Sequence, residues 1–344
     1  MGGLAWMEAC GSAAGQGGEV RVGDYFAGIG AMRLGFDRAC EATGLTARCV
    51  GFSEIDAAAT RTYLRHFGGT PSLGDIRSLA INGQAPACDV LLAGFPCPAF
   101  SIAGRRLGFE DWRGRLFWDL AAVIKAARPS AFLLENVKGL VSHDGGQTLK
   151  IVLETLGGLG YEVHHAVLNA RHFGVPQNRE RIYIVGFLGN GRNFRFPPPT
   201  DPSRTLREVL ETEPVSAKYY VAEDALAAMR HRKARHELKG NGFGYRVLDP
   251  DGVSHALVRG GSGRETNLVV DPRLTVFEAK GKRSPINREM IRHTTPQEWE
   301  RLQGLPTGWT AGNCDTDRYG QLGNAVAVPV IRAIGEAMLS PMAE

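Results

Sequence analysis

The chain has 344 residues, of which 43% are hydrophobic, and its formal charge is +4 at pH 7. These values predict a soluble globular protein of about two domains. They permit a polyanionic partner without requiring one. No stretch approaches the roughly 18 consecutive apolar residues of a membrane span, so we expect no membrane association.

The N-terminal residues 1–19 are rich in Gly and Ala. They lack a basic leader and a sustained apolar core, so they predict a flexible lead-in and not a secretory signal. The six cysteines, at positions 10, 40, 49, 88, 97 and 314, show no CxxC spacing. We therefore expect no metal site and no disulfide framework, and we predict a cytoplasmic protein.

From residue 20 to about 190, short apolar runs alternate with helix-like segments such as 115–128. The predicted strands are residues 20–26, 47–52, 88–95, 130–136, 161–168 and 181–188. They have the continuous apolar character of strands buried on both faces. This alternation predicts a parallel α/β sheet that binds ligands at the carboxyl ends of its strands.

The composition changes at residues 196–203, where three consecutive prolines can continue neither helix nor sheet. A basic run and two Gly-rich stretches follow, so we predict a second, loop-rich domain up to about residue 300. The apolar pattern returns near the C-terminus and predicts a helix packed on the first domain.

Two glycines follow the first predicted strand, in the stretch DYFAGIGAMRLGF. Gly28 and Gly30 fall in the turn before a helix, where glycine lets the backbone approach a ligand and the helix offers free N–H groups. A dinucleotide site would have a third glycine at the position of Arg33. The spacing therefore disfavours a nicotinamide oxidoreductase.

Two acids occupy comparable places further along the chain. Glu54 follows the second strand, where an acid commonly accepts hydrogen bonds from ribose hydroxyls. Asp75, in GDI, is expected at the end of a third strand, within reach of an adenine amino group. Alternatives remain open: the glycines could be simple turn residues, Glu54 a helix-start acid and Asp75 an N-cap.

A thiol and a carboxyl group follow the next two predicted strands. Cys97, between Pro96 and Pro98, follows the fourth strand by this count, and Glu135 follows the fifth. Neighbouring parallel strands would bring both to one edge of the sheet. A thiolate beside a carboxylic acid can add a nucleophile to an electron-poor ring while protonating it elsewhere. Burial of Glu135 would raise its pKa and keep it available as an acid, whereas the alternative for Cys97 is a buried core residue.

Arg179 and Arg181 alternate just before the last predicted strand, in QNRER. Alternation points both side chains the same way, which suits phosphate or carbonyl contacts. A solvated strand edge is the alternative.

Together these motifs resemble the C5-cytosine-specific DNA methyltransferases over residues 20–338. The family's pattern appears in its usual order as FAGIG, EID, GDI, GFPC, RGRLF, ENV, QNRER, RLQGLP and GNAV. The resemblance implies a doubly wound, mostly parallel α/β sheet with a smaller, loop-rich target-recognition domain. The implied domains are a catalytic and cofactor-binding domain over 20–195, the recognition domain over 196–300, and a return segment over 301–344 that completes the catalytic domain.

The resemblance implies S-adenosylmethionine as cofactor, converted to S-adenosylhomocysteine. The implied cofactor residues are Asp24, Phe26, Gly28 and Gly30 at the methionine moiety, Glu54 at the ribose, Ile55, Asp75 and Ile76 at the adenine, and Asn324, which brings the tail helix beside the cofactor domain. A cytosine flipped out of duplex DNA would be attacked at C6 by Cys97 while Glu135 supports N3. Arg181 is implied near the flipped base, and Arg179 accompanies it in the catalytic set.

The segment between QNRER and RLQGLP recognises the target in this family. Its candidate DNA contacts are Arg230, Arg232, Lys233, Arg235, Lys239, Arg246, Arg259 and Arg264, with a solvated basic helix as the alternative for the run from 230 to 239. The stretch KGNGFGY resembles enzymes that methylate CCWGG, CCNGG and CCGG sites, which implies a palindrome that opens with CC and closes with GG. A monomer acting on double-stranded DNA is expected, and an independent restriction endonuclease could accompany it.

Two other functions remain open at this stage: a transfer-RNA cytosine methyltransferase and a catalytically inert DNA-binding relative. The long basic recognition segment and the intact Cys97 and Glu135 disfavour them. One residue departs from the family's pattern, because Pro98 stands where glutamine is usual. Any DNA contact made by that glutamine must be absent or supplied by another residue.

Overall fold

The structure is a computed structural model, and it describes residues 18–96, 112–189, 194–201, 203–274 and 285–340. The predicted lead-in therefore lies almost entirely outside the described residues. The chain divides into two compact units. The first unit comprises residues 1–169, 180–198 and 326–344, and the second comprises residues 170–179 and 199–325.

These units differ from the expected domains at two main places, apart from a shift of three residues at the boundary near residue 196. Residues 170–179 belong to the second unit, and the chain returns to the first unit at residue 326 instead of 301. The RLQGLP segment belongs to the second unit because buried side chains tie it there. Gln177 Nε2, for example, donates to the carbonyl of Leu302 at 2.8 Å.

The first unit is built on a six-stranded sheet in the order β2-β1-β3-β4-β7-β5. Its strands are β1 (Glu19–Tyr25), β2 (Thr46–Ser53), β3 (Val90–Gly94), β4 (Ala131–Val137), β5 (Tyr161–Asn169) and β7 (Glu180–Leu188). All six predicted strands are present. β1 to β4 are mutually parallel, whereas β7 runs antiparallel to both β4 and β5, so the sheet is mixed and not wholly parallel.

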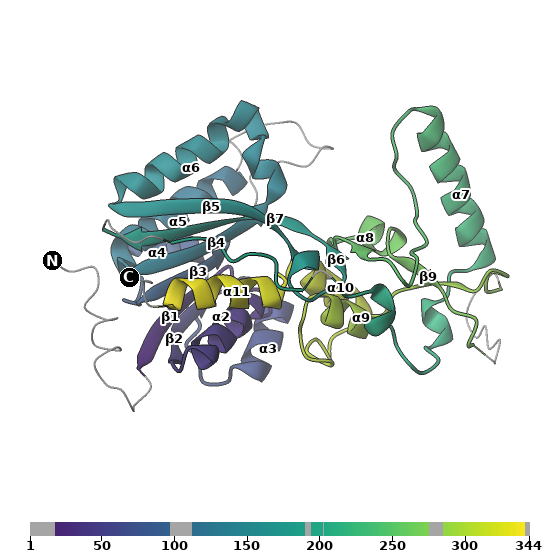
Figure 1. Ribbon diagram of the computed structural model, residues 1–344, viewed down its shortest axis with the longest axis horizontal. Helices are drawn as coiled ribbons and strands as arrows, with labels where there is room; N and C mark the ends of the chain where they lie inside the picture. The colour runs from purple at the N-terminus through teal and green to yellow at the C-terminus, as the bar shows by residue number, and fades with distance from the viewer. Residues whose placement is uncertain (1–17, 97–111, 190–193, 202, 275–284, 341–344) are drawn as a thin grey trace. The chain divides into compact units, whose positions relative to one another are not determined.

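Helices cover both faces of this sheet (Figure 1). They are α2 (Ala31–Ala42), α3 (Ala57–His66) and α11 (Val328–Leu339) on one face, and α4 (Ile76–Asn82), α5 (Trp112–Ala127) and α6 (Gln147–Gly158) on the other. Burial on both faces was predicted for every strand. It holds for β4 but fails for the edge strand β5, most of which is only half-buried.

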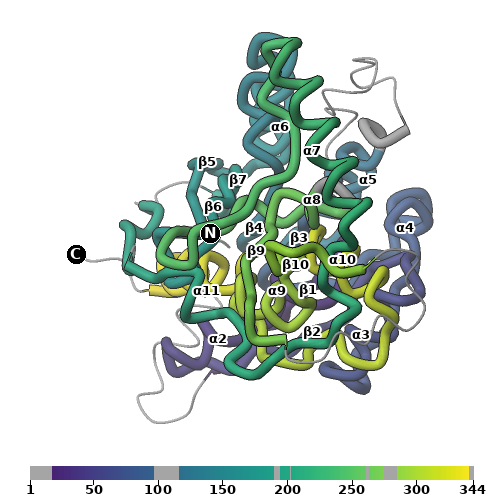
Figure 2. The backbone as a smooth tube through the Cα atoms, turned by 90° about the vertical axis from the view of Figure 1, so that its right-hand side faces the viewer, coloured from purple at the N-terminus to yellow at the C-terminus, as the bar shows by residue number. Residues whose placement is uncertain are grey.

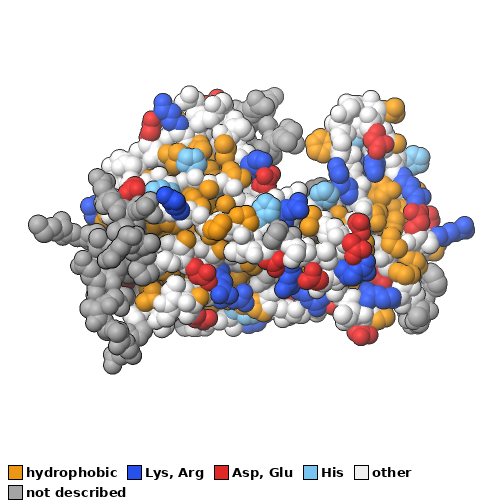
Figure 3. All heavy atoms as spheres, viewed as in Figure 1, with side chains coloured by type: hydrophobic (Ala, Val, Ile, Leu, Met, Phe, Trp, Pro, Cys, Tyr) orange, Lys and Arg blue, Asp and Glu red, His pale blue; other side chains and the backbone are white. Residues whose placement is uncertain are grey.

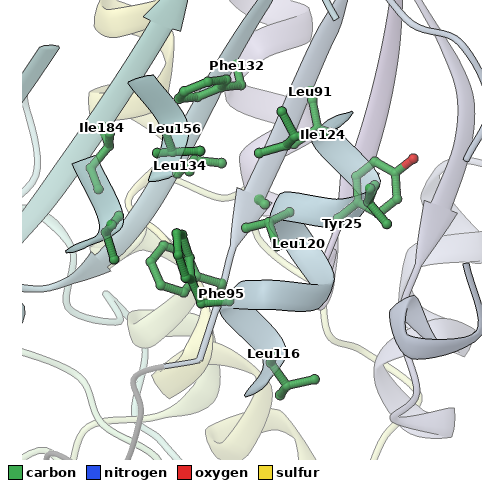
Figure 4. Close-up of a cluster of buried hydrophobic side chains, with 14 of the residues drawn as sticks. Tyr25, Leu91, Phe95, Leu116, Leu120, Ile124, Phe132, Leu134, Leu156 and Ile184 are labelled. Atoms are coloured by element: carbon green, nitrogen blue, oxygen red, sulfur yellow. The ribbon is translucent and has the colours of Figure 1, made fainter. Parts of the chain in front are cut away.

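The core beneath α5 follows from the spacing of its apolar residues. Leu116, Leu120 and Ile124 recur every four residues and therefore lie on one face of the helix. They pack with Leu91 and Phe95 from the β3 segment in one buried cluster (Figure 4). Fully burying a side chain of this size stabilises the fold by about 1.5–3 kcal/mol. This packing anchors the carboxyl end of β3.

The predicted C-terminal helix is confirmed as α11, which packs on α2. A Cβ added to Gly35 would lie 2.6 Å from Cβ of Ile331, and one added to Gly335 would lie 2.7 Å from Cβ of Ala39. Glycine on both helices therefore allows their backbones to approach closely.

The second unit contains short strands and several helices. Its elements are β6 (Gln177–Asn178), β8 (Ser254–His255), β9 (Leu268–Val270), β10 (Ile291–His293), α7 (Glu223–Leu238), α8 (Gly261–Glu265), α9 (Pro296–Leu302) and α10 (Asp315–Asn324). Strand β6 pairs with β8 in parallel, and β9 pairs with β10 in antiparallel orientation. The basic run from residue 230 to 239 lies mainly on α7. This agrees with the alternative interpretation of the run as a basic helix. Figure 2 shows α7 as a long helix that extends from the rest of this unit.

The second unit contains a buried ion-pair network. Arg292 is fully buried and lies 2.8 Å from both Asp271 and Glu298. Burial alone would raise the pKa of Asp271, but Arg273 and Arg292 hold it well below its usual range. Glu298 also closes a capping box with Thr295 at the start of α9.

One segment, Asp315–Leu339, is long and apolar enough to pass a composition test for a membrane span. Within it, 72% of the most apolar window is buried in the protein. The helix is also interrupted at Ala325, which caps α10 in an extended conformation. These properties are those of core helices in a soluble protein.

Candidate active site

The glycine loop after β1 has an unusual backbone. Phe26, Gly28 and Gly30 all have positive φ, at 53°, 55° and 80°, and Gly30 is the N-cap of α2. A Cβ on Gly30 would meet the Phe67 ring at 2.4 Å, whereas one on Gly28 would meet no atom within 4 Å. Gly30 is thus required for packing, while Gly28 borders open space that a ligand could fill.

Glu54 braces this loop from the end of β2. One carboxylate oxygen accepts a hydrogen bond from the N–H of Gly28 at 2.8 Å. The other accepts from the N–H groups of Ile55 at 2.8 Å and Asp56 at 2.7 Å. A carboxylate has about four acceptor sites, so roughly one remains for a hydroxyl group. The helix-start role falls to Asp56, which caps α3.

The three residues predicted to contact the adenine differ in their exposure and in the elements that carry them. Ile55 is 73% exposed, whereas Ile76 is 3% exposed and belongs to the core. Asp75 was expected at the end of a third strand, but it is the N-cap of α4. The preceding residues make only an isolated bridge, between Ser72 and Phe52. The Arg77 side chain donates to Asp75 and holds its pKa below the usual range.

Asp24 is fully buried, so in this structure it cannot touch a ligand directly. Among the described residues, neither of its carboxylate oxygens has a hydrogen-bond partner. Arg33 lies nearby on α2, where Nε is 3.4 Å from Asp37 and Nη1 donates to Thr70 at 2.8 Å. Burial raises the pKa of Asp24 to about 7, against the opposing influence of Arg33, and raises that of Asp37 to about 6.

This buried acid predicts a pH-dependent stability. Between its ordinary pKa near 4 and the raised value near 7, folded Asp24 holds a proton that the unfolded chain releases. The free energy of unfolding should therefore fall as pH rises from 4 to above 7, by up to about 4 kcal/mol from this group. The Asp24→Asn variant should flatten this slope in urea unfolding measured from pH 5 to 8. The exposed control Asp144→Asn should keep the wild-type slope, and an unchanged slope in Asp24→Asn would contradict the assignment.

Glu135 lies within β4 and forms an ion pair with Arg181 on β7. The two residues are near neighbours across the antiparallel β4–β7 pair, and Arg181 Nε is 3.1 Å from Glu135 Oε1. Only 11% of the Glu135 side chain and 12% of the Arg181 side chain are exposed. Gly94, the partner of Glu135 on β3, lies so that an added Cβ would be 3.6 Å from Oε2. The carboxylate therefore lies against the last residue of β3.

Cys97 and Pro98 lie outside the described residues, which resume at Trp112. The segment leading to them is fixed by Asn136, whose buried amide donates to the carbonyl of Phe95 at 3.2 Å. Its Oδ1 accepts from the N–H of Val137 at 2.8 Å. Asn136 was not predicted as a site residue, because only its place in the ENV motif marks it in the sequence. The strand count also changes: with no strand at GDI, Cys97 follows the third strand and not the fourth.

Arg179 and Arg181 do not share surroundings, although alternation predicted that they would. Strand β6 ends at Asn178 and β7 begins at Glu180, so no single strand runs through Arg179. Arg179 is 3% exposed and donates to the carbonyls of Leu257 at 2.6 Å and Ala325 at 2.7 Å. Its contacts are therefore to carbonyl groups of the second unit. Asn324, the last residue of α10, is an exposed residue of that same unit.

Most predicted DNA contacts lie on or near α7, where basic, acidic and hydrophobic side chains are mixed (Figure 3). Arg230 pairs with Glu289, and Arg232 pairs with Glu265 at 3.0 Å. Lys233 lies over the Tyr245 ring and Arg264 over the Tyr319 ring. The remaining four are exposed: Arg235, Lys239, Arg246 and Arg259.

Phe243 was not predicted as a site residue. It is 57% exposed in the loop after α7, and its ring lies edge-on to His236 with centroids 5.8 Å apart. Its place between two glycines in KGNGFGY is the sequence signal that could have indicated it. In the described part of the chain, no group of three or more His, Cys, Asp or Glu side chains could hold a metal.

The mixed sheet, with a glycine loop, an acid at the end of β2 and a buried carboxylate on β4, is typical of α/β enzymes, a class in which ligands bind at the carboxyl ends of the strands. The chain belongs to the C-5 cytosine-specific DNA methylase family, whose family model matches residues 20–340. This match confirms the predicted family and the predicted enzyme class, DNA (cytosine-5-)-methyltransferase.

Curated relatives support this assignment over most of the chain. Type II methyltransferase M.HpaII of Haemophilus parainfluenzae is 47% identical over 325 residues, which cover 93% of this chain and 89% of that protein. Type II methyltransferase M.NlaX of Neisseria lactamica is 41% identical, covering 92% and 96%. The crystal structure of the S. pombe Dnmt2 methyltransferase matches with a TM-score of 0.67 at 18% identity, covering 93% and 98%. This last similarity supports the predicted α/β fold.

Proposed function

We propose that this methyltransferase transfers a methyl group from S-adenosylmethionine to C5 of a cytosine flipped out of a short duplex site, through a covalent bond between Cys97 and C6. The observation that carries this proposal is the Glu135 carboxylate, which lies against Gly94 and pairs with Arg181. Gly94 precedes Cys97 by only three residues. We therefore infer that the Cys97 thiol acts at the sheet edge where this carboxyl group lies.

The glycine loop fits the cofactor, which supplies an electrophilic methyl group when bound. Gly28 borders open space, and Glu54 keeps an acceptor site for a ribose hydroxyl after bracing the loop. Ile55 is exposed beside Glu54 and could cover an adenine. We propose that Asp24 affects the methionine moiety only indirectly, because its side chain is buried.

In the proposed reaction, the Cys97 thiolate adds to C6 while Glu135 interacts with N3 of the cytosine. Electron density then rises at C5, which forms a bond to the methyl group as the methyl–sulfur bond breaks, with S-adenosylhomocysteine as the leaving group. Loss of the C5 proton and departure of the Cys97 sulfur restore the aromatic ring. Arg181 holds the Glu135 carboxylate in position through its ion pair.

The proposed site is a palindrome that opens with CC and closes with GG, methylated at the inner cytosine. The support is the KGNGFGY stretch at residues 239–245. The exposed residues Arg235, Lys239 and Arg246 could contact phosphates near this stretch. We propose that a monomer acts in the cytoplasm on double-stranded DNA, independently of any restriction endonuclease.

The test expresses the chain in a host without cytosine methylation and sequences its DNA after bisulfite treatment. Methylation at CC…GG sites is the expected result, and methylation confined to other motifs would contradict the proposed specificity. Purified protein should transfer labelled methyl groups to duplex DNA and leave transfer RNA unmodified. A preference for transfer RNA would overturn the choice of substrate.

A further inference from the structure

Residues 257–260 of the second unit form a loop whose backbone is held from several sides. Gln177 Oε1 accepts a hydrogen bond from the N–H of Leu257 at 3.1 Å, and Arg179 Nη1 donates to its carbonyl at 2.6 Å. The same guanidinium donates through Nη2 to the carbonyls of Gly323 at 3.3 Å and Ala325 at 2.7 Å. Gln177 and Arg179 are both buried. One arginine thus joins the loop to the end of α10.

Two glycines allow the peptide between Val258 and Arg259 to lie directly against α10 and α8. A Cβ added to Gly323 on α10 would be 2.4 Å from the nitrogen of Arg259 and 2.5 Å from the carbonyl carbon of Val258. One added to Gly263 on α8 would be 2.4 Å from the carbonyl oxygen of Val258. These are backbone atoms, which cannot move aside as a side-chain tip can. Any larger residue at either position would displace the loop.

The loop presents Arg259 to solvent at a fixed position. Arg259 is exposed, and the next residue, Gly260, has a φ of 109°. The guanidinium Nε lies 3.8 Å from the position of a Cβ on Gly320, so the side chain runs along α10. A fixed backbone reduces the entropy lost when this side chain binds a ligand.

We propose that Arg259 is a specificity-determining residue that donates to the O6 and N7 acceptors of a guanine in the recognised site, and that Gly323 is its positioning residue. Bidentate contact with guanine is the commonest specific use of arginine in the major groove. A site that closes with GG supplies such guanines. This inference rests on the proposed function, since it names one base contact of that enzyme.

The first test compares Arg259→Ala and Arg259→Lys with the wild type on the cognate duplex and on duplexes with single base-pair changes. Loss of a bidentate base contact should lower kcat/KM on the cognate site by about 10- to 100-fold and abolish discrimination at one base pair. Lysine should restore it only in part, because an ammonium lacks the rigid planar pair of donors that matches the two guanine acceptors. If lysine restores full activity, or if all duplexes lose activity equally, Arg259 contacts phosphate and the proposal is overturned.

The second test uses a matched pair of glycines on α10. Gly323→Ala should reproduce the selectivity loss of Arg259→Ala, whereas Gly320→Ala should retain wild-type selectivity, because its Cβ would make only ordinary contact. The double variant Arg259→Ala/Gly323→Ala should be no less selective than Arg259→Ala alone. Affinity for S-adenosylmethionine, measured by calorimetry, should not change in either glycine variant. Equal selectivity in the two glycine variants would overturn the positioning role.

The outcomes separate this inference from the function on which it rests. A wild-type protein that transfers no methyl group to any DNA would refute the proposed function. A wild-type protein that is active and selective, beside an Arg259→Ala variant equally active and selective, would refute only this inference. If Gly323→Ala fails to fold, the Arg259 variants still decide the base contact.

Discussion

Replacing Cys97 with serine is expected to lower methyl transfer by about 10⁴-fold or more, the scale of loss when an enzyme's nucleophile is removed. The hydroxyl group is a much weaker nucleophile than the thiolate at neutral pH, so attack on C6 should become limiting. The measurement is single-turnover transfer of labelled methyl groups to the cognate duplex.

The control for this variant is Cys314→Ser, which alters an exposed cysteine of the second unit and should retain full activity. Duplex DNA with 5-fluorocytosine at the target position gives a second readout, because fluorine cannot leave C5 as the proton does. The wild type should form a complex with this DNA that resists denaturant, and Cys97→Ser should not. A serine variant that keeps more than about one hundredth of wild-type activity would fall far short of the expected loss, so another nucleophile would have to act.

Replacing Glu135 with glutamine is expected to lower kcat by about 10²- to 10⁴-fold, the usual contribution of a positioned acid or base. The amide keeps the shape of the side chain, but it carries no exchangeable carboxyl proton and no charge. The substitution also removes the charged partner of Arg181 in an ion pair that is almost fully buried. The KM for DNA should change little, since the effect is on the chemical step.

Glu180→Gln is the matched control for Glu135→Gln. Glu180 is also a paired carboxylate, but it binds Lys138 at 2.9 Å with 44% of its side chain exposed. Exposed pairs contribute little, so this variant should behave as the wild type. Equal activity of Glu135→Gln and the wild type in single-turnover assays would remove Glu135 from the proposed mechanism.

The sequence predicted the strands of the first unit well because buried strands require continuous apolar runs, which local inspection detects. It could not predict the direction of β7, since periodicity reports burial and not orientation. Asp75 shows a related failure: the GDI motif was expected at the end of a strand, yet the segment before it makes only an isolated bridge to Phe52. The motif therefore did not indicate which element carries Asp75.

The partners of the site residues depend on contacts between distant segments. Alternation predicts that the side chains of Arg179 and Arg181 point the same way only if one strand continues through both residues. The strand is interrupted at Arg179. The bond from Gly28 to Glu54 joins residues 26 positions apart, and that from Asn136 to Phe95 joins residues 41 apart. Such pairings follow from tertiary packing, which no local pattern encodes. The ion pair between Glu135 and Arg181 likewise follows from the antiparallel pairing of β4 with β7.

The packing of α11 on α2 has a consequence for how this protein folds during synthesis. The close fit of Gly35 to Ile331 joins residues almost 300 positions apart, so α2 emerges from the ribosome long before its cover. Contacts of such high sequence separation form slowly, and an uncovered apolar helix face favours aggregation in the meantime. The helix that begins at the glycine loop is therefore fully buried only after nearly the whole chain has been synthesised.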